Sequence, residues 1–221
     1  MPEKPRVKAP KQRAGAPQGT STGSRLAVLG AALGALVAVG AVAAFVGLGG
    51  GGGGVDEAAV RTALRAAGCT LQDVPAKPGA HSVQDPGGTA PSWNTDPPTN
   101  GAHYAVAAIF GIYEEPLELA RVVHNLEHGG IFVFYGEDVP RATVNELRGF
   151  YSDHQTGTIM APLPRLGDQF ALGAWVAEGE IEKGYLAKCR TFDEAALSTF
   201  FRELQFKGPE RFDPSDLQPG R

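Results

Sequence analysis

Residues 26–48, LAVLGAALGALVAVGAVAAFVGL, contain no charged or strongly polar side chain. A helix needs roughly 20 apolar residues to cross a hydrocarbon core of about 30 Å, and Gly and Ala are frequent in such helices. This stretch therefore predicts one transmembrane helix at 26–48. A cleaved signal peptide or a buried core helix is the alternative, although the apolar region of a signal peptide is usually only about 7–15 residues long.

Basic residues are concentrated before this apolar stretch. Residues 1–25 carry six Lys or Arg and one Glu, a net charge of +5, so the remaining residues must carry −9 to give the total of −4. Lys and Arg stay on the cytoplasmic side of a membrane, which predicts a cytoplasmic N-terminus and a C-terminal part outside. The adjacent apolar stretch explains the basic tail better than nucleic-acid binding does. We expect a membrane as partner and no nucleic acid; the sequence identifies no protein partner.

Composition divides the rest of the chain into one domain and its flanking segments. Residues 1–25 contain little that could be buried and should be disordered. The six glycines at 49–54 predict a flexible linker. Residues 55–210 should then form a single extracytoplasmic domain of modest size, followed by a tail at 211–221.

Helical and strand patterns alternate in this domain without a regular βαβ rhythm, which predicts an α+β fold. The expected helices lie at 56–68, 116–128, 140–154 and 191–204, and the expected strands at 70–74, 131–135 and 169–177. Thr191 and Glu194 have the spacing of a capping box at the start of the last helix. Residues 75–103 contain six prolines and should form a long loop, and loops of this length are often functional.

The chain has two cysteines, Cys69 and Cys189. They do not form a C-x-x-C pair and are too few for a zinc site of their own. Because thiols outside the cytoplasm tend to be paired, we expect a disulfide. A loop of over 100 residues would make it contribute about 4–5 kcal/mol in the chain-entropy model. Two buried free thiols are the alternative.

The segment VVHNLEHGGIFVFY contains the motif His124-x-x-Glu127-His128. Residues four apart on a helix lie about 5–6 Å apart on one face, so both imidazoles could bind one metal ion. His103, in the proline-rich PPTNGAH loop, could supply a third imidazole. Three histidines are a suitable ligand set for zinc or copper.

Further residues could complete such a site. Met160 or His154 could be a fourth ligand, and a thioether would favour Cu(I). Metal-bound imidazoles usually donate their second N–H to another group, for which the sequence offers Tyr104, Tyr113 and Asn125. His81 lies in a different part of the long loop, and we expect it to take no part.

Three other interpretations of these residues remain open. In the first, the histidines are structural: His128 would cap a helix that ends at Gly129, and Met160 would fill the core. In the second, the protein is a zinc-dependent hydrolase, with His124 and His128 as ligands and Glu127 as general base. No acidic ligand is evident downstream of the motif, which counts against the hydrolase. The third is a non-catalytic interaction domain of the cell envelope.

The strings DPPTNGAHY, GIY and VVHNLEHGGIFVFY resemble the bacterial membrane-anchored domain-of-unknown-function family 3105. The pattern of that family is a Pro-Pro-Thr-Ser-Gly-Pro-His loop followed by His-Ser-Leu-Glu-His-Gly. Asn100, Ala102 and Asn125 replace residues of this pattern, whereas every histidine is present. The resemblance covers about residues 69–206 and implies a membrane-anchored protein whose function is unassigned.

The charge distribution generates a prediction about topology. A reporter that is active only outside the membrane should be active when fused after Arg221 and inactive when fused after Arg13, because the positive tail should remain in the cytoplasm. Reporter activity of the two fusions measures this directly. The reverse pattern of activity would contradict the predicted orientation.

Overall fold

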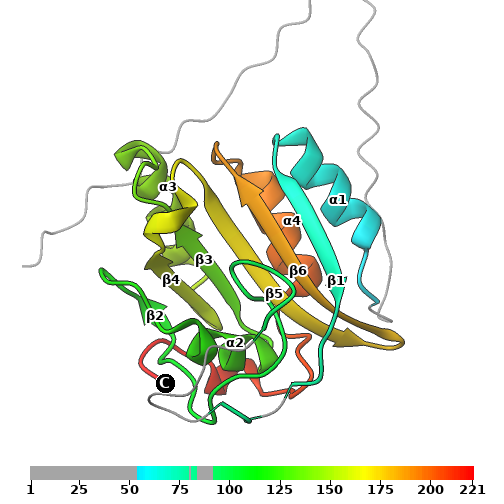
Figure 1. The fold of residues 1–221 in the computed structure, drawn as a ribbon. Coiled ribbons are helices and arrows are strands. Elements are labelled where there is room, and N and C mark those ends of the chain that lie inside the picture. The colour runs from blue at the N-terminus through cyan, green and yellow to red at the C-terminus, as the bar shows by residue number, and fades with distance from the viewer. Residues whose placement is uncertain (1–53, 80, 84–91) are drawn as a thin grey trace, which may run out of the picture. The chain divides into compact units, whose positions relative to one another are not determined.

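The computed structural model describes residues 54–79, 81–83 and 92–221. They form a six-stranded mixed sheet with the strand order β1-β6-β5-β3-β4-β2 and four α-helices (Figure 1). The predicted α+β fold is confirmed. Strands β1, β6, β5 and β3 pair antiparallel, whereas β3, β4 and β2 pair parallel.

The elements expected before the domain lie outside the described residues. These are the tail at 1–25, the transmembrane helix at 26–48 and all of the glycine linker except Gly54. Among the residues that the structure describes, no helix is both long enough and apolar enough to span a membrane.

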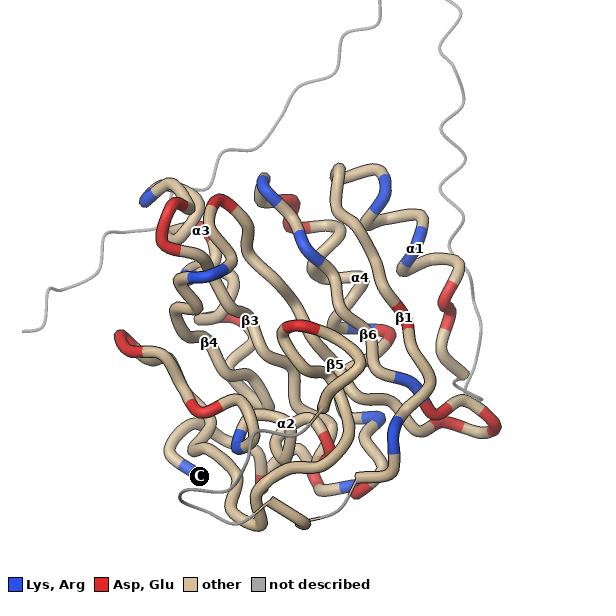
Figure 2. The backbone as a smooth tube through the Cα atoms, viewed as in Figure 1, with Lys and Arg blue, Asp and Glu red and all other residues tan. Residues whose placement is uncertain are grey.

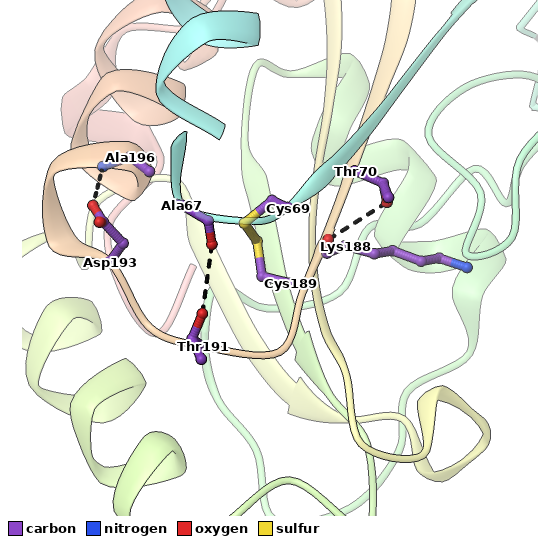
Figure 3. Close-up of a disulfide and its surroundings, with 8 residues drawn as sticks. All are labelled: Ala67, Cys69, Thr70, Lys188, Cys189, Thr191, Asp193 and Ala196. Carbon is purple, nitrogen blue, oxygen red and sulfur yellow. Dashed lines mark hydrogen bonds between the residues drawn. A yellow bond between two sulfur atoms is a disulfide. The ribbon is translucent and has the colours of Figure 1, made fainter. Parts of the chain in front are cut away.

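The expected helices all form. They are α1 (Glu57–Ala66), α2 (Leu119–Glu127), α3 (Arg141–Asp153) and α4 (Glu194–Leu204), with short 3₁₀ turns at Pro164–Leu166 and Pro214–Asp216. Asp56 caps α1 by accepting a hydrogen bond from the Ala59 N–H. The capping box expected at Thr191 is wrong, because α4 begins later. Asp193 accepts from the Ala196 N–H, and the Thr191 hydroxyl instead donates to the Ala67 carbonyl (Figure 3).

The three expected strands correspond to β1 (Thr70–Pro75), β3 (Ile131–Tyr135) and β5 (Phe170–Glu178). Three further strands escaped sequence analysis: β2 (Gly111–Ile112), β4 (Thr158–Pro162) and β6 (Ile181–Cys189). β6 carries charged residues in its first half, which obscures its apolar second half. β2 has only two residues, too few for any period-2 pattern to show.

Both faces of the central strands are buried, and a separate part of the core lies on each face. Successive side chains of a strand point to opposite faces. Ile131 and Val133 of β3 accordingly pack with α1, α3 and α4, whereas Phe132 and Phe134 pack with α2. Figure 2 shows charged residues mainly at turns and on helices; β3 has none and β5 has only Glu178 at its end. This arrangement explains the uninterrupted apolar sequence of β3.

The predicted disulfide between Cys69 and Cys189 is confirmed (Figure 3). It continues the β1–β6 ladder by one residue beyond the pair Thr70 and Lys188, with the two Cα atoms 4.4 Å apart. The disulfide therefore joins the turn between α1 and the edge strand β1 to the end of the neighbouring strand β6.

The last eleven residues, expected to form a tail, lie against the domain. Leu217 is buried on the face of the sheet covered by α2. Its carbonyl accepts a hydrogen bond from the Gly157 N–H at 2.7 Å, and the Arg221 carbonyl accepts one from the Phe110 N–H at 2.7 Å.

Replacing both Cys69 and Cys189 by Ser should lower the free energy of unfolding by about 4–5 kcal/mol, because the disulfide closes a loop with a sequence separation of 120 residues. Urea unfolding of the chain from Gly54 onward measures the loss. A reducing agent should destabilise the parent by a similar amount and leave the double variant unchanged. Alkylation of either cysteine in the folded, unreduced protein would contradict the pairing.

Candidate metal centre

Helix α2 places the motif His124-x-x-Glu127-His128 at its C-terminal end. Val123 and Leu126 pack on the sheet, and His124 and Glu127 are nevertheless also buried, because other segments of the chain cover them. The helix ends where the glycine pair predicts: His128 is the C-cap, and Gly129 has a φ of +88°. This left-handed conformation turns the chain into β3.

The proline-rich loop is ordered around His103 and holds this residue in the interior. Thr99 and Asn100 are fully buried, and the Thr99 N–H donates to the Thr95 hydroxyl at 3.0 Å. Gly101 has a φ of +99°, and its carbonyl accepts a hydrogen bond from His103 Nδ1–H at 2.8 Å. His103 has no solvent exposure, so its ring orientation is set by the loop rather than by solvent.

The three histidines singled out from the sequence converge. The ring centroids of His103 and His124 are 5.1 Å apart, and those of His124 and His128 are 4.5 Å apart. The combination of helical spacing and an ordered loop therefore produces the expected cluster.

The expectation that His81 stands apart from this cluster is wrong. Its ring stacks on that of His124 with centroids 4.6 Å apart, and its Nε2 is 3.5 Å from Oε2 of Glu127. A bridge between Val83 and Tyr104 brings this part of the long loop back beside the chain that carries His103. His81 is therefore a fourth histidine of the cluster, close to His124 in the fold although far from it in the sequence.

Backbone carbonyls determine which ring nitrogens are available. Nδ1 of His103 lies 2.8 Å from the Gly101 carbonyl, and Nδ1 of His124 lies 2.8 Å from the Tyr104 carbonyl. A carbonyl can only accept, so both Nδ1 atoms carry hydrogen, and both Nε2 atoms are left for a metal ion or a second proton. Metal-ligating histidines commonly show this arrangement. Tyr104 thus supports the site through its backbone, not through its phenol.

Glu127 and His103 form a buried charged pair, with 2.9 Å between Glu127 Oε2 and His103 Nε2. Burial opposes the charge on both groups, but their hydrogen bond and mutual attraction outweigh it. The pKa of His103 is therefore raised and the pKa of Glu127 is lowered. Burial, together with the neighbouring histidines, lowers the pKa of His124 and that of His128. Those two rings are held neutral, the form that binds metals.

Met160 and His154, the other two ligands expected from the sequence, are not brought to the cluster. Met160 of β4 is fully buried among the side chains that pack with α1, α3 and α4, because its neighbours Ile159 and Ala161 point to the face covered by α2. The alternation of the strand excludes Met160 as a ligand to these histidines. His154 ends α3 and stacks on Phe150 with ring centroids 3.9 Å apart.

Asn125 and Tyr113 also have roles other than those expected. The Asn125 side chain accepts from the Ala108 N–H at 2.9 Å and donates to the Ala108 carbonyl at 2.7 Å. The Tyr113 hydroxyl donates to the Ile109 carbonyl at 2.6 Å. These bonds hold the segment before β2 in place and do not involve the imidazoles.

Sequence analysis missed Glu210, which lies beside His128 with 3.4 Å between Oε2 and Nε2. The Glu210 N–H donates to the Glu127 carbonyl at 3.0 Å, and the Phe212 ring lies 4.1 Å from the His128 ring. No local pattern could have identified Glu210, because it comes from the segment after α4.

The resulting cluster could hold a metal ion. Two overlapping groups have ligand atoms that all lie within 4.8 Å of one another: His81, His103 and His124 form one, and His124, Glu127 and His128 form the other. Nitrogen and carboxylate oxygen are suitable donors for zinc and copper.

In the metal-free protein, Glu127→Gln should lower the pKa of His103, since burial would no longer be offset by the carboxylate. The pair stabilises the fold at pH values above the unfolded pKa of Glu, about 4.3, and below that of His, about 6.5. Its contribution declines as the pH rises through the raised pKa of His103 or falls through the lowered pKa of Glu127. NMR titration of the imidazole nitrogens measures the pKa of His103 in the parent and in the variant. An unaltered His103 titration would contradict the pairing, and Glu118→Gln, on an exposed part of the chain, is the control.

Comparison with known proteins identifies a family whose model covers most of these residues. A family model described as "Protein of unknown function (DUF3105)" matches residues 87–216, which is more than half of the chain and includes His103, His124, Glu127, His128 and Glu210. No curated protein and no solved structure matches. The chain belongs to the DUF3105 family of proteins of unknown function.

Proposed function

We propose that this domain binds a divalent transition-metal ion, zinc or copper, through its histidine cluster. The observation that carries the proposal is the hydrogen bonding of His103 and His124. Both donate Nδ1–H to backbone carbonyls, which leaves Nε2 of each ring as the atom available to a metal ion; at His103 the ion would replace the proton shared with Glu127.

The donor types favour Zn²⁺ or Cu²⁺ over Cu⁺. Cu⁺ prefers thiolate and thioether ligands, but both cysteines are paired in the disulfide and Met160 lies on the other face of the sheet. The remaining donors are imidazole nitrogens and carboxylate oxygens. With bonds of about 2.0–2.1 Å, two ligands of a tetrahedral ion lie about 3.4 Å apart. The 3.0 Å between Nε2 of His124 and Nε2 of His128 is close to this separation.

We further propose that the domain acts outside the membrane, anchored by a helix at 26–48. The uncharged stretch and the +5 tail before it support this topology. The disulfide supports it independently, because disulfides are rare in reducing cytosolic proteins.

A second candidate function is metal-dependent hydrolysis. Peptidases with the His-x-x-Glu-His motif use the two histidines as zinc ligands and the glutamate as general base. Glu210, beside His128, is an acidic neighbour of the kind that the sequence alone did not reveal. Loss of peptidase activity in Glu127→Gln with the metal retained would support this candidate. Loss of the metal itself would instead identify Glu127 as a ligand.

The full chain, purified without a histidine tag, should contain a transition metal by elemental analysis. His124→Ala should lower the content by at least half, because His124 belongs to both candidate ligand groups. His154→Ala is the matched control and should retain the metal. Affinity should fall steeply below about pH 6, since bound imidazoles must be neutral. Protein that stays metal-free after incubation with Zn²⁺ and Cu²⁺ would refute the proposal.

A further inference from the structure

The donor atoms of the cluster divide into two sets. In the first donor set, Nε2 of His103 and Nε2 of His81 lie 2.9 and 3.5 Å from Oε2 of Glu127. His81 and His103 come from the long loop and Glu127 comes from α2, and both imidazoles approach the same carboxylate oxygen. The first donor set therefore consists of two imidazoles and one carboxylate.

The second donor set has the same composition. Nε2 of His128 lies 3.0 Å from Nε2 of His124 and 3.4 Å from Oε2 of Glu210. α2 supplies both imidazoles, and the segment after α4 supplies the carboxylate. The two sets as defined share no residue, and His124 lies at their junction, because it is also close enough to share one ion with His81 and His103 or with Glu127 and His128.

These separations match those expected around metal ions. Bonds of about 2.0–2.1 Å place neighbouring ligands of one ion about 2.9–3.4 Å apart for angles between 90° and the tetrahedral value. The first donor set shows 2.9 and 3.5 Å and the second shows 3.0 and 3.4 Å, so three of the four separations fall in this range and the fourth exceeds it by 0.1 Å. Six donors are too many for one tetrahedral ion. A single ion would leave at least two of these groups without a metal bond.

We propose that the cluster is a dinuclear centre that binds one divalent ion in each donor set. This inference rests on the proposed metal-binding function and specifies its stoichiometry and ligands. Each ion has three protein ligands, which leaves a position for water or another small ligand, as in catalytic zinc sites. Each set also contains one carboxylate, Glu127 or Glu210, to offset the positive charge of its ion.

The exposure of the two sets is consistent with loading from solvent. His81 and Glu210 have side chains 43% and 50% exposed, whereas their partners His103 and His124 are buried. Each set thus combines a buried imidazole, oriented by a backbone carbonyl, with a ligand at the surface.

The stoichiometry tests the inference. The full chain without a histidine tag, stripped with a chelator and titrated with Zn²⁺, should bind two ions by native mass spectrometry. His81→Ala and Glu210→Gln should each bind one ion. Both positions are substantially exposed, so these variants should retain the fold. His154→Ala and Glu118→Gln are the matched controls and should still bind two.

Binding of Cu²⁺ gives an independent test of whether the two bound ions lie close together. With two Cu²⁺ bound, the EPR spectrum should show coupling between the spins, because all donors lie within one small cluster. His81→Ala and Glu210→Gln should each give the uncoupled spectrum of a single Cu²⁺. A spectrum of two uncoupled ions in the parent would place the second ion elsewhere and overturn the dinuclear centre.

The outcomes separate this inference from the proposed function. One ion in the parent chain would overturn the dinuclear centre and leave metal binding intact. No bound ion would overturn both. Two ions in the parent that persist in both His81→Ala and Glu210→Gln would overturn the assigned ligand sets.

Discussion

The burial of both faces of the central strands is the constraint on which the rest of the structure depends. β3 and β5 expose almost no side chain, so apolar elements must cover each face. Helices α1, α3 and α4 cover one face, and α2 covers the other together with the segments around it. Because α2 has only nine residues, the long loop and the C-terminal segment must complete the second face. Those two segments are the ones that deliver His81, His103 and Glu210 to the motif on α2.

The cluster also shows how a polar site is kept inside an otherwise apolar layer. A buried carboxylate or imidazole without a partner is strongly unfavourable. Each buried group here has one: Glu127 contacts His103, while Nδ1 of His103 and Nδ1 of His124 donate to carbonyls. The backbone thereby fixes the orientation of both rings. The same contacts that make burial tolerable would also orient the rings for the proposed metal ion.

The family assignment says nothing about activity, whereas the geometry of the cluster does suggest a chemistry. DUF3105 is a family of proteins of unknown function, so membership assigns no activity to this chain. The positions of named atoms, by contrast, indicate a chemistry: imidazole nitrogens and a carboxylate oxygen lie close enough together that they could hold a metal ion. A mechanism for this protein therefore has to be built from the site itself, because a shared fold does not establish a function.

Local patterns in the sequence were sufficient for the four helices, for β1, β3 and β5, and for the pairing of His124 with His128, because each depends on neighbours within a few residues. The cysteine pairing followed from the compartment expected for the domain. Contacts between residues far apart in the sequence could not be predicted from local patterns. Side chains of β4 alternate between the two faces of the sheet, which places Met160 on the face away from the histidines, and the folded loop stacks His81 on His124. Glu210 reaches His128 only because the chain after α4 returns to the end of α2. Helical spacing determined one half of the site. The packing of distant segments over α2 decided the other half, because those side chains are far apart in sequence and meet only in the folded structure.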